Sequence, residues 1–320
     1  MTGIRTVSGD IEDFAGFAYM HEHLIIDSPL IDCKFPHISL NDADTAVAEV
    51  SACVAAGAGL MVDAMPAAAG RSIAKLIDVA GRTGINIVAA TGLHHDRYYG
   101  PRHWSNRVSV DDLVTLFVAD LTEGIDEFDY TGPLVRRSPG RSGLLKVATS
   151  GRRPDIRDVR NLAAVAQASL RTGAPVMTHC EGGWGGLAQV EHLLGHGLAP
   201  GSIILSHVDK AHDAGYLSEL AATGVFLELD QALREKDKGT DSVTISSVLS
   251  LIDAGFAGQI VLGTDGARRT LWQSLGGTPG LAWLASGFIP ELAAAGVGPD
   301  LIPLLTHDNP RRALTWRTAT

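Results

Sequence analysis

Eight short runs of β-branched and aliphatic residues recur along the chain, separated by longer amphipathic stretches, and this alternation limits the possible folds most. It predicts βα units and a parallel sheet. We expect strands at residues 17–20, 60–63, 85–90, 144–148, 175–178, 203–206, 225–229 and 260–263. We expect helices between them at residues 44–56, 110–124, 155–172, 213–222 and 244–254, among others.

Eight strands with intervening helices predict an α/β fold, a (β/α)8 or TIM barrel whose site lies at the carboxyl ends of the strands. The alternative is an open, doubly wound sheet. However, no GxGxxG sequence follows the first strand and no P-loop sequence occurs in the chain, so the barrel is favoured. A barrel of this type commonly uses roughly 200 to 250 residues or more. We therefore expect residues 1–320 to form one domain.

Charge and composition exclude several classes of function. The formal net charge of −10 would repel a nucleic-acid backbone, so nucleic-acid binding is disfavoured. No run of 18 uncharged apolar residues occurs and the first ten residues lack the pattern of a signal peptide, which predicts a cytoplasmic protein without a membrane partner. The three cysteines are scattered, a spacing that fits neither a disulfide framework nor a zinc finger.

Five residues of metal-binding types stand at the carboxyl ends of predicted strands. His21 and His23 follow the first strand, and since residues i and i+2 of a strand share a face, both would project into the barrel mouth. Asp265 would complete a site for a divalent ion, and His179 and His207 could hold a second ion. A lone histidine at a strand end is more often a hydrogen-bonded structural residue. Five such positions at one edge favour a two-metal site.

Lys146, in the fourth predicted strand, needs a separate explanation. An ammonium group has no lone pair for a metal and would repel nearby cations. Carbamylation by carbon dioxide would convert Lys146 into an anion with two oxygens that could bridge both metals. The alternative is a lysine paired with a carboxylate in the barrel interior.

Four segments of the chain resemble the phosphotriesterase family of the amidohydrolase superfamily, and within it the phosphotriesterase-like lactonases. They are residues 143–183, MHEHL at 20–24, ILSHVDK at 204–210 and VLGTDGARR at 261–269. The order, spacing and strand context of these segments agree with the family over nearly the whole chain. The closing NPRRAL at 309–314 resembles the C-terminal helix of the family.

The resemblance implies a hydrolase with two divalent metal ions. By this resemblance His21, His23 and Asp265 hold one ion, His179 and His207 hold the other, and a carbamylated Lys146 bridges them. A hydroxide between the ions then attacks the substrate, and Asp265 accepts its proton. Mainly imidazole ligands favour Zn²⁺, with Mn²⁺ or Co²⁺ as alternatives. The resemblance also implies a homodimer, although the sequence leaves the oligomeric state open.

Charged and phenolic residues in the predicted loops indicate which substrate is hydrolysed. Cations and phenols from three loops could converge on one phosphate group of a small anionic substrate. The alternative is that they are solvated loop charges. The candidates for substrate binding are Arg268 and Arg269 after the eighth strand, Arg234 and Lys236 after the seventh, and Tyr98 and Tyr99 after the third.

The pattern ARRxxWxxxGGxPG at 267–280 resembles family members that open phosphorylated sugar lactones. We therefore interpret the protein as a metal-dependent lactonase acting on a small polar, phosphorylated sugar lactone. One alternative is a phosphotriesterase or a broad carboxylesterase on the same metal core, because one hydroxide can attack carbon or phosphorus. A second alternative is a barrel that binds a ligand without catalysis.

Overall fold

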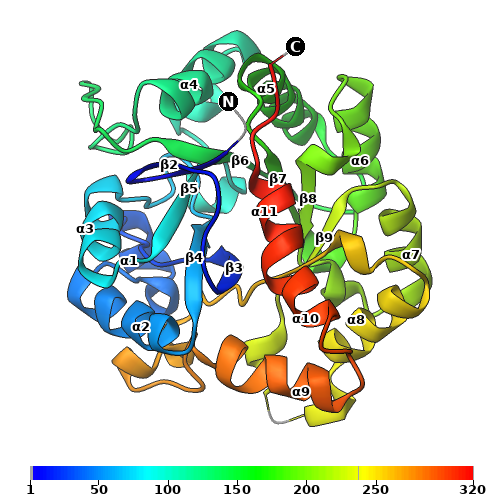
Figure 1. The fold of residues 1–320 in the computed structure, drawn as a ribbon. Helices are drawn as coiled ribbons and strands as arrows, with labels where there is room; N and C mark the ends of the chain where they lie inside the picture. The colour runs from blue at the N-terminus through cyan, green and yellow to red at the C-terminus, as the bar shows by residue number, and fades with distance from the viewer. Residues whose placement is uncertain (1–2, 237, 320) are drawn as a thin grey trace.

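Eight parallel strands form a single sheet that curves into a barrel (Figure 1). The computed structural model describes residues 3–236 and 238–319. All eight expected strands are present, in chain order around the sheet, so the predicted barrel is confirmed. They are β3 (Phe17–Glu22), β4 (Ala58–Asp63), β5 (Asn86–Leu93), β6 (Ser142–Thr149), β7 (Val176–Cys180), β8 (Ile203–Ser206), β9 (Phe226–Leu229) and β10 (Ile260–Leu262).

Helices surround the barrel and shield the outer face of its strands (Figure 1). The five helices expected by residue range are confirmed, with ends that differ by at most two residues. The helices between strands are α1 (Pro29–Lys34), α2 (Ala43–Ala55), α3 (Ile73–Thr83), α4 (Val110–Thr122), α5 (Ile156–Thr172), α6 (Gly186–Gly195), α7 (Ala214–Ala222) and α8 (Val243–Asp253). After β10 come α9 (Ile289–Ala294), α10 (Leu301–Pro303) and α11 (Asn309–Leu314), and α11 is the helix expected for NPRRAL.

The ends of the barrel differ in how they are closed. At the amino end, the hairpin of β1 (Ile4–Thr6) and β2 (Gly9–Ile11) and helix α11 cross the opening (Figure 1). Ile4, Ala313 and Leu314 pack there against the apolar side chains that point into the barrel. At the carboxyl end, the backbone amides of Thr264 and Asp265 donate to the carbonyl of His21, at 3.2 and 2.9 Å. The seam between the first and last strands therefore lies where the candidate site residues meet.

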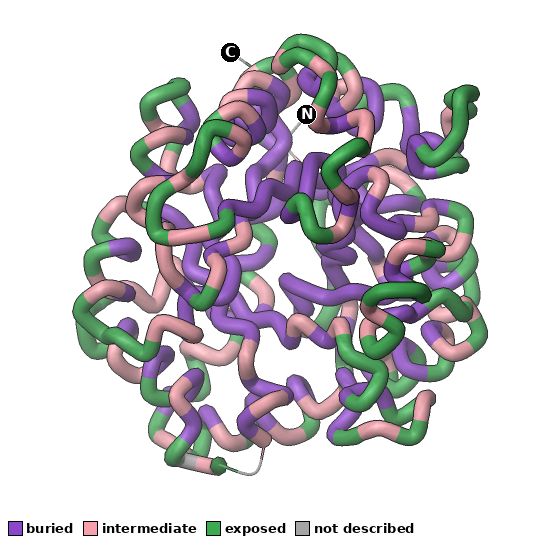
Figure 2. The backbone as a smooth tube through the Cα atoms, turned by 180° about the vertical axis from the view of Figure 1, so that it is seen from behind, coloured by how far each residue is buried: buried purple, intermediate pink, exposed green. Residues whose placement is uncertain are grey.

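Inward-facing side chains change from apolar to polar along β6 and β7. Leu144 lies in the apolar interior and Lys146 follows two residues later, and Met177 and His179 repeat this pattern in β7. Because alternate residues of a strand share a face, these polar groups point into the barrel above an apolar floor. The buried strands stand out in Figure 2, which shows mostly exposed segments at the periphery.

An extra residue in β3 aims the histidine pair into the barrel. From Tyr19 to Glu22 this strand advances three residues while its neighbour β4 advances two, which is the signature of a β-bulge. The bulge inverts the alternation of side chains. Met20 therefore belongs to the apolar interior, and yet His21 and His23 reach the site above it.

The position beside Lys146 requires glycine. Gly92 pairs with Lys146 across β5 and β6, has φ of 110°, and a Cβ there would lie 1.9 Å from the Lys146 carbonyl oxygen. We expect Gly92→Ala to lower the free energy of unfolding by more than the roughly 1–3 kcal/mol of backbone strain alone, as measured by urea denaturation. The control is Gly84→Ala, because Gly84 has φ of 74° but no heavy atom lies within 4 Å of the position that the added methyl would take. Equal losses in the two variants would contradict the steric argument.

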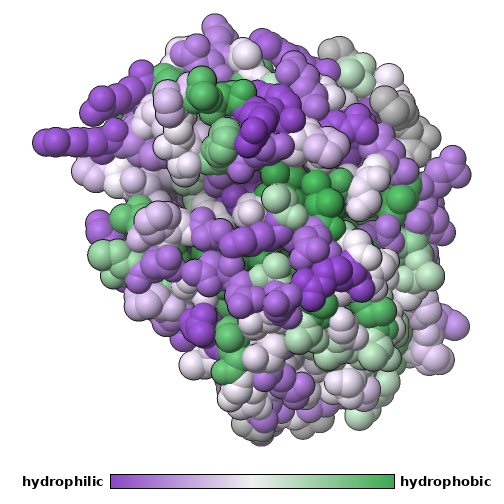
Figure 3. Space-filling model, turned by 90° about the vertical axis from the view of Figure 1, so that its left-hand side faces the viewer, coloured by the Kyte–Doolittle hydropathy of each residue, from purple (hydrophilic) through white to green (hydrophobic). Residues whose placement is uncertain are grey.

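The surface is mixed in polarity. On the face drawn in Figure 3, hydrophobic residues form patches separated by hydrophilic ones. Within residues 3–236 and 238–319, no helix is both long enough and apolar enough to span a bilayer.

Candidate active site

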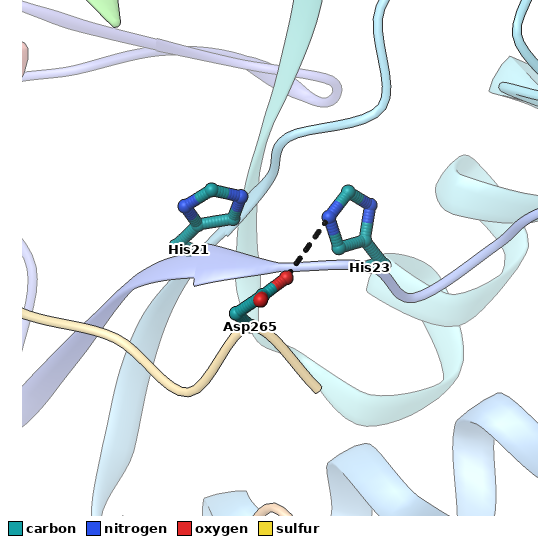
Figure 4. Close-up of side chains that lie close together, drawn as sticks. All are labelled: His21, His23 and Asp265. Carbon is teal, nitrogen blue, oxygen red and sulfur yellow. Dashed lines mark ion pairs between the residues drawn. The ribbon is translucent and has the colours of Figure 1, made fainter. Parts of the chain in front are cut away.

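Four histidine rings meet at the carboxyl end of the barrel. The ring centroids of His21 and His207 are 4.7 Å apart, and those of His179 and His207 are 4.4 Å apart. His21 and His23, both from the β3 end, lie beside Asp265, which follows β10 (Figure 4). His23 Nε2 is 3.6 Å from Asp265 Oδ1. The structure thus brings together residues that are up to 244 positions apart in the sequence.

Two of these residues have an unusual backbone conformation. His207 has φ of 67° and Asp265 has φ of 45°, in the left-handed region that residues other than glycine rarely adopt. Such conformations persist only where the surrounding structure holds them, and they cluster at functional sites. At His207 the turn points Nε2 at His179 Nδ1, 2.9 Å away. These two nitrogens form the second pair of candidate metal ligands.

Lys146 lies inside the histidine cluster. Its side chain is buried, and Nζ is 3.2 Å from His21 Nε2 and 3.4 Å from Ser206 Oγ. Burial disfavours the charged form and lowers the pKa of Lys146 to about 8, against the opposing charges of nearby carboxylates such as Glu228. The amine is therefore easier to deprotonate than an exposed lysine.

Two buried carboxylates at the end of β9 support the histidines. Glu228 Oε2 is 3.1 Å from His21 Nδ1, and Asp230 Oδ2 is 2.7 Å from His207 Nδ1. Carboxylates in this position fix the ring orientation and leave the opposite nitrogen to bind a metal. Neither residue was predicted from the sequence. Phe226, Glu228 and Asp230 are nevertheless spaced two residues apart, as are the two histidines of the pair His21 and His23.

The donor set fits divalent metal ions. Ligand atoms of His21, His23 and Asp265 lie within 4.8 Å of one another, and Nδ1 of His179 lies 2.9 Å from Nε2 of His207. Burial lowers the pKa of His23 to about 3 and that of His207 to about 4, so both rings are neutral near pH 7 and keep a lone pair for a metal. Imidazole and carboxylate donors together suit zinc, manganese or cobalt.

Asp265 is held by two cations. Arg234 Nη2 donates to its Oδ2 at 3.1 Å and to its backbone carbonyl at 2.8 Å, and Lys210 Nζ lies 3.5 Å from Oδ2. Burial raises the pKa of Asp265, but the charges of Arg234 and Lys210 outweigh burial and hold this pKa well below its ordinary value. Asp265 is therefore ionised. The guanidinium of Arg234, expected from the sequence to bind substrate, thus also orients the candidate catalytic carboxylate.

A cavity of about 450 Å³ opens over the cluster. Its lining includes the four candidate histidine ligands and Asp265, with polar side chains contributed by the surrounding loops. Three residues expected to bind substrate, Tyr98, Arg234 and Arg268, are on the wall, together with Arg97, Glu181, Lys210 and Gln231.

Three other expected substrate residues do not line this cavity. Tyr99 is buried, and its hydroxyl donates to one backbone carbonyl and accepts from one backbone amide, so its hydrogen-bonding capacity is used in the fold. Arg269 donates to the carbonyl of Ser39 at 2.9 Å, and Lys236 donates to a threonine hydroxyl at 3.4 Å. Of the six candidates, the structure therefore gathers Tyr98, Arg234 and Arg268 at the cavity.

Comparison with known proteins places this site in a family. The model of the phosphotriesterase family matches residues 2–314. The chain belongs to the phosphotriesterase family. The fold, the order of the strands and the clustered histidines agree with the resemblance noted in the sequence.

Individual members of the phosphotriesterase family match over nearly the whole chain. A protein named phospho-furanose lactonase from Mycoplasmopsis synoviae is 31% identical, over 98% of this chain and 91% of that protein. The crystal structure of an amidohydrolase from Mycoplasma synoviae has a TM-score of 0.94 at 28% identity, covering 100% of this chain and 93% of the other. The crystal structure of a lactonase from Listeria monocytogenes has a TM-score of 0.90 at 25% identity, covering 99% of this chain and 100% of the other. This member of the family is accordingly a metal-dependent hydrolase of the phosphotriesterase and lactonase type.

Proposed function

We propose that this member of the phosphotriesterase family opens a small sugar lactone that carries a phosphate. The observation that carries the proposal is the presence of Arg97, Lys210 and Arg268 in the same cavity as the histidine cluster. These cations suit an anionic substrate, because charge in a cleft acts locally and outweighs the net charge of −10. A relative that covers 98% of the chain is named phospho-furanose lactonase, which supports the same substrate class.

The proposed metal centre uses residues from five strands. Two divalent ions, zinc by the chemistry of the donors and otherwise manganese or cobalt, are held by His21, His23, His179, His207, Asp265 and a Lys146 carbamylated by carbon dioxide. The position of Lys146 among these ligands supports the last assignment, because an unmodified ammonium would repel the ions. When bound, the ions supply Lewis acidity toward the lactone carbonyl and lower the pKa of water.

Side chains of the protein accept and donate the proton that is transferred in the reaction. In lactone opening, water adds to the carbonyl carbon, the ring C–O bond breaks, and one proton passes to the ring oxygen. Asp265 is ionised and lies on the cavity wall, so its carboxylate can accept the proton from water and return it to the leaving oxygen. Arg234 and Lys210 keep this carboxylate in place.

The test is turnover of two pentonolactones that differ only in a 5-phosphate, followed as proton release by zinc-loaded protein. We expect the phosphorylated lactone to be strongly preferred. Since a hydrogen bond to a charged group contributes roughly 1.5–3 kcal/mol, Arg268→Gln should lower kcat/KM for this lactone by about 10- to 100-fold and leave the unphosphorylated lactone unchanged. Arg269→Gln, at the neighbouring residue outside the cavity lining, is the matched control.

Other outcomes distinguish the alternatives. Equal turnover of both lactones would reject phosphate recognition and favour a broad esterase or phosphotriesterase on the same metal core. Equal ligand binding by metal-free and zinc-loaded protein, without turnover, would favour a ligand-binding barrel.

A further inference from the structure

Three candidate ligand histidines each have their second ring nitrogen against a carboxylate. For His21 and His207 the carboxylates belong to Glu228 and Asp230, which are fully buried. For His179 it belongs to Glu181, whose Oε2 accepts a hydrogen bond from Nε2 at 2.9 Å. Glu181 differs from the other two because its side chain is 41% exposed and lines the substrate cavity.

The geometry of His179 determines which nitrogen faces which partner. Its Nδ1 points to Nε2 of His207, 2.9 Å away, and its Nε2 points to Glu181. A neutral imidazole carries one proton, and the nitrogen without it binds the metal. A carboxylate cannot donate a proton in its ionised form, so the proton of His179 belongs on Nε2. The metal-binding lone pair is then on Nδ1, on the side of His207.

Glu181 is itself held by the loop that follows β5. His95 Nε2 lies 3.1 Å and Arg97 Nη2 lies 3.3 Å from Glu181 Oε2. The backbone from Glu181 to Gly183 forms a single 3-10 turn directly after β7. One carboxylate oxygen therefore connects the loop carrying Arg97, on the substrate side, to a candidate metal ligand.

We propose that Glu181 is a positioning residue that fixes His179 in the Nε2–H tautomer and so presents Nδ1 to the metal. This inference rests on the metal centre of the proposed function, in which His179 is a ligand. The rival reading is that Glu181 is itself a ligand, because His95, His179 and Glu181 also bring donor atoms within 4.8 Å of one another.

The test is the affinity of the full-length protein for zinc, measured for each ion by competition with a chromophoric chelator. We compare the wild-type protein with Glu181→Ala and Glu181→Gln, and use Glu191→Gln on the exposed face of α6 as a control for loss of charge. Removing a carboxylate that orients a ligand histidine commonly costs about 10- to 100-fold in metal affinity. We expect this loss for one of the two ions in Glu181→Ala, and a much smaller loss in Glu181→Gln, whose amide oxygen still accepts from Nε2–H.

Each other outcome has a defined meaning. Unchanged affinity for both ions in Glu181→Ala overturns the positioning role. Equal losses in the alanine and glutamine variants also overturn it, because glutamine preserves the hydrogen bond and is a poor substitute for a carboxylate ligand. A wild-type protein that binds no zinc rejects the metal centre itself, which separates failure of the proposed function from failure of this inference.

A second readout reports on the tautomer directly. In NMR spectra of the zinc-loaded protein, long-range proton–nitrogen correlations of the histidine rings should place the His179 proton on Nε2. The variant Glu181→Gln should preserve this assignment. Protonation of Nδ1 instead would contradict the proposal. The buried side chain of His95 also faces Glu181, so thermal unfolding of the metal-free variants is measured to separate a loss of stability from the loss of zinc affinity.

Discussion

Lys146→Met is expected to remove at least one of the two metal ions and to lower kcat/KM by on the order of 10³-fold or more. A metal ion acting as a Lewis acid contributes several kcal/mol to a transition state, and each 1.4 kcal/mol is a factor of ten in rate. The side chain lies 3.2 Å from His21 Nε2 inside the buried cluster. Methionine keeps the unbranched shape and has no amine to react with carbon dioxide. Metal content by elemental analysis and lactone turnover measure the two effects separately.

The matched control is Lys75→Met, at a partly exposed lysine that pairs with Asp27 away from the cavity. This variant should keep both metals and full activity. If Lys146→Met kept two zinc ions per chain and activity within tenfold of the wild type, Lys146 would not bridge the metals. In that case the lysine would be a structural residue of the barrel interior, which is the alternative left open by the sequence.

The barrel could be predicted from the sequence because the strands are short and mainly apolar, and several of them end in or are followed closely by a polar residue. Strands of a barrel are buried on both faces, so these runs stand out against the amphipathic helices. The direction of the side chains near the strand ends was harder to predict. In β3 the bulge between Tyr19 and Glu22 adds a residue that no local pattern reveals, and only the strand pairing shows how Met20 and His21 can both face inward.

The metal cluster could be predicted because its residues are chemically rare at strand ends. Its supporting carboxylates were missed for different reasons. Glu228 and Asp230 share the inward face of β9 by the same two-residue alternation, so that alternation could have predicted both. Glu181 lies in a turn after His179, and the sequence does not show that this turn folds back onto the ring.

The substrate loops could be predicted only in part. Loop cations occur on many barrels, and their partners depend on contacts between segments distant in the chain. Arg234 contacts Asp265 and Arg269 contacts Ser39, across separations of 31 and 230 residues. Nothing in the local sequence distinguishes these arginines from Arg268, which lines the cavity.

The second large effect is expected for Asp265→Asn, which should lower kcat by about 10²- to 10⁴-fold, the usual contribution of a positioned acid or base. Asparagine has nearly the same shape and its amide oxygen still accepts from Arg234, so the loop after β10 should keep its conformation. It cannot accept a proton from water, and it donates less charge to a metal. Turnover must therefore be measured at saturating zinc, with the bound metal counted in the same samples.

Two results for Asp265→Asn lead to different conclusions. If the metal content is full and kcat falls while KM changes little, Asp265 acts on the proton in the transition state. If activity returns to the wild-type value once zinc is in excess, the carboxylate serves only to bind metal and another group must take the proton.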